Sequence, residues 1–514
     1  MHCRHGAMEG HPGAGAVESV VSIADAVAAG RARAGQSVAQ HITRHQATHA
    51  ALNALVQPCH AAAVGEADRI DCIMRSGTDH EAGQSHMLAG VPVSVKECFP
   101  VRGLVTTLGI PSRRHCLDAA DAPLVERMRM AGAIVVGKAN VPQALYLYET
   151  DNPVWGRTNH PQAQGRGPGG SSGGDACLVA AGVVPLAVAN DLAGSIRQPA
   201  HACGVAGIVP RSTALGDGGS FRTMPELTAV KPRAGFLARH VADLERALAA
   251  VGVITPPPRK PLSTVRPLRI AWWDDAGPLE PSVAVRRGVH EAVAGLRSAG
   301  LEIVQLDGRT ARQAAWVHLA LLSSDGGRQV RQLFAGSRPM PPVLRQLKLA
   351  GLPRWVRPLV AGLANVAGRS IEAEAIFATG PRSAAGFQRI LEARQRLGAE
   401  VDAMAMDYDA IVCPVSALPA LRHGTAGLLL LAAAPCMLAN LLDLPAGSVP
   451  ISHVRPGEEK GRAVSRDPVM QAAADTDSGS CGLPIGVQVI GLNGGETTVL
   501  EVMRLIEGLS QESR

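Results

Sequence analysis

Apolar positions in the first 191 residues switch between helical and strand spacing. Residues 18–56 carry apolar side chains at helical intervals and predict two helices. The β-branched runs 91–97 and 133–140 are short, are bounded by turn residues and predict buried strands. A helical pattern over 121–133 separates them, which predicts a strand–helix–strand unit with parallel strands. Residues 175–191 predict a helix followed by another strand.

The pattern continues in the second half of the chain. Two strand-like runs, 268–275 and 301–307, enclose a helical pattern over 283–299. Further predicted elements are strands at 409–416 and 484–491, a polar surface loop at 454–480 and a closing helix at 496–509. We therefore expect one large α/β domain over 18–514, with a mixed, mostly parallel central sheet flanked by helices. Residues 1–17 are expected to form a flexible tail.

Composition narrows the class of protein. Apolar residues make up 46% of the 514 positions, so a large core can be buried, although aromatic residues are only 3%. The formal charge of +6 falls well short of a nucleic-acid-binding footprint. The ten cysteines contain no CxxC pair, which argues against zinc and disulfides and favours a reducing compartment. No signal peptide or membrane-spanning stretch is evident, so we expect a cytoplasmic protein.

Two serines in glycine-rich turns and one buried lysine carry the candidate chemistry. Ser171 lies in GPGGSSGG, Ser195 in NDLAGSIRQP and Lys96 in GVPVSVKECF. Glycines let a serine be presented in a strained, exposed turn. Desolvation lowers the pKa of a lysine on an apolar strand, so its neutral amine can act as a base. The three residues have the parts of a Ser-Ser-Lys hydrolytic triad.

Each motif also has a simpler interpretation. The GSSGG stretch fits a nucleophile elbow centred on Ser172, but an elbow follows a strand and here a loop precedes it. A phosphate-binding loop would have lysine where Asp175 stands, and a flexible linker is the plainest alternative. Lys96 alone could be an edge lysine with a snorkelling stem. The combination of all three motifs favours the triad.

The turn that holds Ser195 suits an oxyanion hole. Small residues before Ser195 leave the backbone N–H groups of 192–195 free to converge on one point. A helix that begins after Ser195 would add positive potential there. We expect Arg197 to pair with a carboxylate such as Asp191 rather than to bind substrate.

Longer motifs resemble a known family. They are VSVKE, GKANVPQ, GGSSGGDACLVAAGVVPLAVANDLAGSIRQP, CGVAGI, LARHVADL and GLPIGVQVIG. Together they are similar to the amidase signature family over residues 18–510. The resemblance implies Lys96 as base, Ser171 as bridging serine after a cis Gly170–Ser171 peptide and Ser195 as nucleophile. It implies an oxyanion hole or substrate-binding set of Leu192, Ala193, Gly194 and Ser195 with Gly170 and Ser172, and no metal or cofactor.

Within the family, the chain resembles fatty acid amide hydrolases. Residues 343–366 interleave apolar and basic side chains around Trp355, as in a helix that lies in a membrane interface. We expect an amphipathic membrane or substrate cap at 340–366, with a core-facing helical hairpin or a homodimer contact as the alternatives. Three departures from the family stand out: Ala193 for glycine, Asn190 for threonine and a rebuilt loop at 207–216.

The sequence therefore predicts an amide hydrolase that forms an acyl-serine intermediate. Lipophilic or fatty acid amides are the expected substrates, bound as small molecules, with no nucleic-acid partner and with peripheral membrane contact through 343–366. Three alternatives stay open: a small or aryl amide hydrolase, a glutamine-using amidotransferase subunit, and a weakly active or non-catalytic homologue suggested by Ala193.

Overall fold

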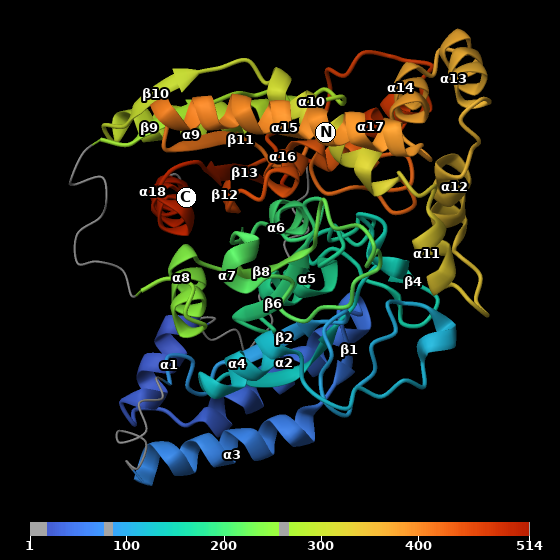
Figure 1. Cartoon of the computed structure of the whole chain (residues 1–514). Helices are drawn as coiled ribbons and strands as arrows, with labels where there is room; N and C mark the ends of the chain where they lie inside the picture. The colour runs from blue at the N-terminus through green and yellow to red at the C-terminus, as the bar shows by residue number, and fades with distance from the viewer. Residues whose placement is uncertain (1–17, 77–85, 256–266, 513–514) are drawn as a thin grey trace.

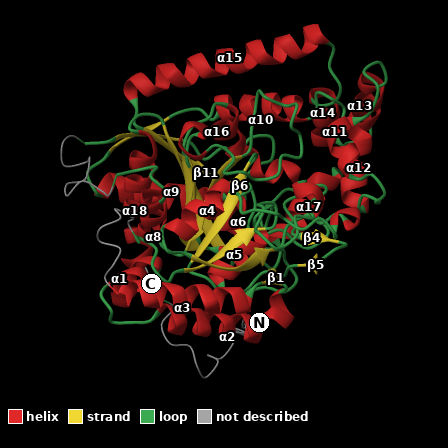
Figure 2. Cartoon of the chain, turned by 60° about the horizontal axis from the view of Figure 1, so that its bottom comes forward, coloured by secondary structure: helices red, strands yellow, loops and turns green. Residues whose placement is uncertain are grey.

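The centre of the protein is an 11-stranded sheet (Figures 1 and 2). The computed structural model describes residues 18–76, 86–255 and 267–512, so the predicted tail at 1–17 lies outside the described residues. In spatial order the strands are β1 (Leu55–Pro58), β3 (Ile134–Ala139), β2 (Pro92–Lys96), β6 (Leu186–Asp191), β8 (Arg233–Ala238), β7 (Ala206–Val209), β12 (Ala446–His453), β13 (Pro484–Gly491), β11 (Ala410–Pro414), β9 (Arg269–Trp272) and β10 (Glu302–Gln305). A separate two-stranded ribbon pairs β4 (Asp151–Asn152) with β5 (Gly156–Arg157).

The sheet is mixed, as predicted, but the prediction that it is mostly parallel is wrong. Four strand pairings within the described residues are parallel, β2–β3, β2–β6, β9–β10 and β9–β11, and six are antiparallel. The strands β7, β8 and β12 were not predicted. All four pairings that these strands make are antiparallel, and they make antiparallel pairings the more numerous kind among the described strands.

Helices flank the sheet. Those before residue 260 are α1 (Val20–Ala28), α2 (Ala34–Leu52), α3 (His60–Ser76), α4 (Pro123–Met130), α5 (Gly173–Ala180), α6 (Arg197–Cys203), α7 (Ser212–Leu215) and α8 (Val241–Ala250). Those after it are α9 (Val283–Ser298), α10 (Arg309–Leu322), α11 (Arg328–Leu333), α12 (Pro341–Ala350), α13 (Arg357–Val366), α14 (Ser370–Ala378), α15 (Ala384–Asp407), α16 (Met437–Leu441), α17 (Pro468–Asp477) and α18 (Gly495–Glu512). Short 3₁₀ turns lie at Pro111–Arg113, Gln143–Leu145 and Leu430–Cys436.

The predicted helices at the N-terminus, between the strands and at the C-terminus are present as α1, α2, α4, α9 and α18. The predicted polar loop at 454–480 is wrong in part, because it contains α17. This helix begins at Pro468 after an aspartate cap, and it buries Val469 and Ala473, so its apolar face belongs to the core.

The basic amphipathic stretch forms α12 and α13, which stand with α11 at the right edge of Figure 1. Several large apolar side chains there are exposed: Trp355 is 82% and Val366 is 89% accessible, with Leu359 and Leu363 above 60%. Val343 and Leu347 of α12 are buried in the core instead. None of the described helices combines the length and apolar character needed to cross a bilayer.

Candidate active site

Parallel pairing of β2 with β6 positions the candidate residues. Lys96 is the last residue of β2, and Asn190 and Asp191 end β6, whose first three residues pair with Val93–Val95 of β2. Because parallel strands end at the same edge of a sheet, the lysine and the turn after β6 lie together. Ser195 lies in that turn, just before α6, and Ser171 lies in the glycine-rich loop just before α5.

The three side chains that the sequence singled out form a continuous chain of contacts. Lys96 Nζ lies 2.8 Å from Ser171 Oγ, and Ser171 Oγ lies 3.0 Å from Ser195 Oγ. Lys96 is completely buried, Ser171 is 2% exposed and Ser195 is 9% exposed. Both distances are hydrogen-bond lengths. A proton can therefore pass along this chain of polar atoms without any histidine or carboxylate.

The amine of Lys96 has only uncharged hydrogen-bond partners. Besides Ser171, it contacts the side-chain oxygen of Asn190 at 2.7 Å and the backbone oxygen of Asn190 at 3.2 Å. Burial lowers the pKa of Lys96 below its ordinary value, while Cys98, Asp175 and Asp191 oppose this from a distance. The direction of this shift favours the neutral amine.

A buried ion pair stabilises the turn after β6. Both carboxylate oxygens of Asp191 accept from the Arg197 guanidinium, at 3.0 and 3.1 Å, so the predicted pair is present. The same guanidinium also donates to the side chains of Gln488 and Asn440 and to a backbone oxygen. Although burial opposes the charge, Arg197 lowers the pKa of Asp191 well below its usual range. Arg197 is thus a structural residue here.

The backbone of the turn leaves a smaller donor set than the sequence predicted. The N–H of Gly194 donates to Asp191 Oδ1 at 2.7 Å and is therefore already used. Within the described residues, no hydrogen bond uses the N–H groups of Leu192, Ala193 or Ser195. Gly194 has φ +99°, and an added Cβ would lie 2.7 Å from Cys436, so a side chain would not fit.

Ala193, the departure from the family, has room for its methyl group. It packs against Ala315, Ala434 and Met437, on α10 and on the segment before and within α16. Its carbonyl accepts from the hydroxyl of Tyr148 at 2.6 Å. The extra methyl is thus accommodated in a small apolar cluster, while the buried tyrosine holds the adjoining peptide.

Gly170 and Ser172 support the loop that presents Ser171. The Gly170–Ser171 peptide is cis, as the resemblance implied. The N–H of Gly170 donates to Gln198 Oε1 at 3.1 Å, and the N–H of Ser172 donates to Ser195 O at 3.1 Å. A Cβ on Gly170 would lie 2.6 Å from a backbone oxygen, which requires glycine there. These two residues therefore join the two serine loops to each other and to α6.

A small pocket opens beside the two serines. Its volume is about 40 Å³. Its lining residues are Leu145, Ser171, Asn190, Leu192, Ser195, Phe221, Arg222, Thr223, Met224, Leu227, Val230 and Pro232. More than half of them come from the segment 221–232, which contains no helix or strand. The apolar members are suited to an uncharged, non-polar part of a substrate.

Sequence reasoning missed several residues of the site. Asn190 was noted only as a departure, yet it makes two of the three contacts to Lys96, and its Nδ2 donates to Ser220 Oγ at 2.9 Å. Tyr148 and the 221–232 segment gave no signal, because their role depends on tertiary packing rather than on a local pattern. In the described ranges, no group of three or more His, Cys, Asp or Glu side chains could hold a metal ion.

Comparisons with known proteins identify similar sequences. A family model described as Amidase matches residues 36–500. Fatty-acid amide hydrolase 1 of Sus scrofa is 30% identical over 449 residues, which are 83% of this chain and 77% of that protein. An indoleacetamide hydrolase of Bradyrhizobium diazoefficiens is 32% identical over 308 residues, 56% of this chain and 57% of that protein.

A solved structure shares the fold. The structure of a fatty acid amide hydrolase superposes with a TM-score of 0.78 and 21% sequence identity. The superposition covers 96% of this chain and 85% of the other. The arrangement of sheet and helices is therefore that of a known amide-hydrolysing enzyme.

Proposed function

Because the chain belongs to the amidase family and is an amide hydrolase, we propose that Ser195 cleaves the amide bond with Ser171 and Lys96 as its proton relay. The observation that carries this proposal is the unbroken contact chain from Lys96 Nζ through Ser171 Oγ to Ser195 Oγ, with distances of 2.8 and 3.0 Å. The product of the first step is an acyl-Ser195, which water then hydrolyses.

The two oxygens of Asn190 direct the proton path. A neutral amine has two N–H groups and one lone pair. If its N–H groups donate to the backbone and side-chain oxygens of Asn190, the lone pair faces Ser171, the remaining neighbour. Lys96 then accepts the proton of Ser171 as Ser171 accepts that of Ser195, and Ser195 attacks the amide carbonyl.

The free backbone donors support the second half of the reaction. The N–H groups of Leu192, Ala193 and Ser195 can stabilise the oxyanion, and one such donor is typically worth about 3 kcal/mol of the barrier. We leave Gly194 out of this set because its N–H is bound to Asp191. Ser171 returns the proton to the departing amine, so no metal or organic cofactor takes part in the proposed steps.

We propose lipophilic amides as substrates, with fatty acid amides as the specific choice. The apolar lining of the pocket, including Leu192, Phe221 and Met224, supports this, as does the similarity to fatty-acid amide hydrolase 1. A second candidate is a small or aryl amide, because about 40 Å³ leaves little room for a long acyl chain without movement of the 221–232 side chains. Similarity to an indoleacetamide hydrolase points the same way.

The exposed apolar side chains of 343–366 support a peripheral membrane role for this cap. Trp355, Leu359 and Leu363 are exposed near basic residues such as Arg354, and this combination binds membrane interfaces. If so, a Trp355→Ser/Leu359→Ser double variant should sediment with lipid vesicles several-fold less than the parent chain. Equal sedimentation of both chains would contradict membrane contact through this cap.

An active-site probe tests the catalytic proposal. We expect a fluorophosphonate to form an adduct on Ser195 that is absent in Ser195→Ala and much slower in Lys96→Ala. If the parent chain forms no adduct, the result would contradict the catalytic proposal and support a non-catalytic homologue. Glutaminase activity that depends on partner subunits would instead support an amidotransferase.

A series of unbranched amides from two to sixteen carbons, assayed with aryl acetamides, then identifies the substrate class. Rising kcat/KM with chain length supports fatty acid amides. A maximum at short chains or at aryl amides would support the second candidate.

A further inference from the structure

A groove of about 480 Å³ lies away from the catalytic serines, between α10, α13, the end of α14 and α15. In Figure 1 these helices lie in the upper part of the view, with α13 and α14 at the right. The lining residues are Trp316, Val317, Ala320, Arg354, Arg357, Pro358, Phe377, Ala378, Arg382, Gly386, Arg389, Ile390 and Ala393. Its members are thus apolar or aromatic residues, one glycine and four arginines.

The charge of this groove is not neutralised by the protein. Among the described residues that line it there is no carboxylate. Arg357 donates to three backbone oxygens and to a threonine hydroxyl, and Arg382 donates to two backbone oxygens. Arg354 and Arg389 are exposed and make no ion pair with any described carboxylate. Burial, followed by the neighbouring arginines, lowers the pKa of Arg357 and Arg382.

The start of α13 adds positive potential to the same groove. This ten-residue helix begins at Arg357 with no side-chain cap and no acidic residue in its first turn. The positive end of a helix dipole and its unpaired N–H groups attract anions. The helix start and the arginines are independent features, and both favour a negatively charged ligand.

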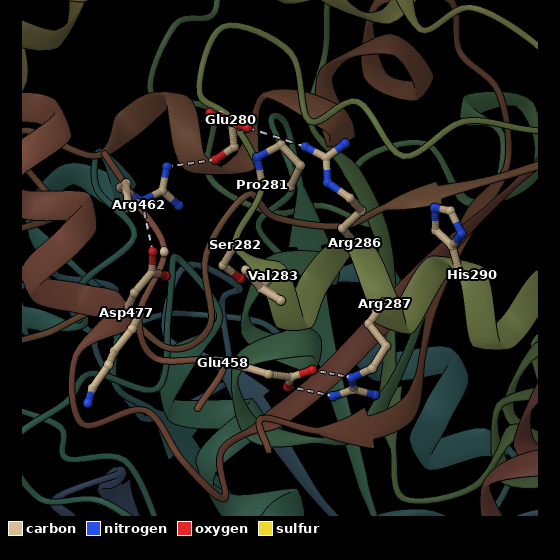
Figure 3. Close-up of a pocket in the computed structure, with 12 residues that line it drawn as sticks. Glu280, Pro281, Ser282, Val283, Arg286, Arg287, His290, Glu458, Arg462 and Asp477 are labelled. Carbon is tan, nitrogen blue, oxygen red and sulfur yellow. Dashed lines mark hydrogen bonds and ion pairs between the residues drawn. The ribbon is translucent and has the colours of Figure 1, made fainter. Parts of the chain in front are cut away.

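A second pocket of similar size shows the contrast. It lies at the start of α9, has a volume of about 420 Å³ and also contains three arginines (Figure 3). There each arginine faces a carboxylate: Arg287 pairs with Glu458, Arg462 with Asp477, and Arg286 with Glu280 at 3.4 Å. Positive side chains alone therefore do not indicate an anion site. The groove differs because its countercharge is missing.

We propose that the groove binds a long-chain carboxylate, a fatty acid anion. The carboxylate would lie among Arg354, Arg382 and Arg389, and the hydrocarbon tail would lie on the apolar floor formed by Trp316, Phe377 and Ile390. The choice of ligand rests on the proposed function, because hydrolysis of a fatty acid amide releases this anion. The site lies outside the catalytic pocket, with which it shares no lining residue.

α10 connects the groove to the catalytic turn. Trp316, Val317 and Ala320 of this helix line the groove, whereas Ala315 belongs to the apolar cluster against which Ala193 and Leu319 both pack. A ligand in the groove would thus be separated by α10 from the turn that contains Ala193.

Calorimetric titration of the full chain with decanoate, below its micelle-forming concentration, tests the proposal. Decanol supplies the same tail without the charge. We expect decanoate to bind at least tenfold more tightly than decanol, and more weakly as salt is added. An Arg354→Gln/Arg389→Gln variant should lose at least tenfold in affinity for decanoate. Arg286→Gln, in the charge-balanced pocket, is the matched control and should bind as the parent chain does.

Three results would overturn the proposal. Equal affinity for decanol and decanoate would show that charge plays no part. Undiminished binding by the double variant would place the carboxylate elsewhere, for example in the catalytic pocket. Binding only to vesicles of anionic phospholipid would assign the arginines to a membrane surface. Because the titration needs no turnover, hydrolysis without decanoate binding would sink this inference alone, and binding without any amide hydrolysis would sink only the proposed function.

Discussion

Two basic side chains lie fully buried near the ends of β2 and β6, and the protein treats them in opposite ways. Lys96 receives only neutral oxygens, mainly from Asn190, and its pKa is lowered by burial. Arg197 receives the carboxylate of the next residue, Asp191. Adjacent residues of one strand, Asn190 and Asp191, thus provide an amide for the lysine and a carboxylate for the arginine. The comparison teaches that the choice of acceptor, rather than burial itself, separates the proposed base from a structural charge.

Replacement of Lys96 should give the largest loss of activity among these variants. We expect Lys96→Met to lower kcat/KM for amide hydrolysis by about 10⁴-fold, because the relay loses its base while the buried stem is retained. Chemical denaturation should show little loss of stability, since an uncompensated buried amine contributes little to folding. A variant that keeps more than a tenth of the parent activity would show that Lys96 is not the base.

Removal of the arginine should affect the fold more than the chemistry. Arg197→Met leaves Asp191 buried without its partner, and we expect a loss of about 3–5 kcal/mol in the free energy of unfolding. Urea denaturation measures it. The double variant Asp191→Asn/Arg197→Met should recover part of the loss. Destabilisation below about 1 kcal/mol would mean that the pair does not hold the turn.

A carboxylate beside the lysine should turn the base into a second ion pair. Asn190→Asp would raise the pKa of Lys96 and favour the ammonium form, which cannot accept a proton. We expect about a 100-fold loss of kcat/KM at neutral pH, with partial recovery as the pH rises. Asn190→Leu is the control, because it removes the acceptor without adding charge. An unchanged pH profile in Asn190→Asp would contradict the account of the charge state.

Buried histidines extend the comparison to groups that titrate near neutrality. Burial lowers the pKa of His160 to about 4, while its ring donates to a backbone oxygen and accepts from the Gln162 N–H. The unfolded chain binds this proton below about pH 6.5, so stability is lost as the pH falls from there towards 4. At pH 5 this loss in the free energy of unfolding is about 2 kcal/mol. The free energy of unfolding of His160→Gln, taken from denaturation curves, should change less with pH over this range than that of the parent chain. An equal pH dependence in both chains would contradict the prediction.

The sequence predicted that Lys96, Ser171 and Ser195 come together, and it predicted much of the sheet, because these features are local. Lys96 ends a β-branched run and both serines lie among glycines, so pattern and motif agree. The central strands were missed for a physical reason. β12, for example, contains glycine, serine and proline, which disfavour strands, and its position between β7 and β13 decides its conformation.

The donor set of the turn was misjudged for a related reason. Small residues from Leu192 to Ser195 indicate a turn of free N–H groups, but the carboxylate that takes up the Gly194 N–H is oriented by Arg197. Such second interactions depend on the folded neighbourhood. The same holds for the pocket wall at 221–232, which no periodic pattern marks.

The charge state of Lys96 is the central claim, and magnetic resonance can measure it directly. The chain contains only six lysines, so ¹³Cε-labelled lysine gives few signals, and Lys96→Met identifies the one of interest. We predict that this signal reaches the free-amine position at a pH clearly below that of the exposed lysines. A Lys96 signal that stays at the ammonium position throughout the pH range in which the enzyme hydrolyses amides would contradict the account.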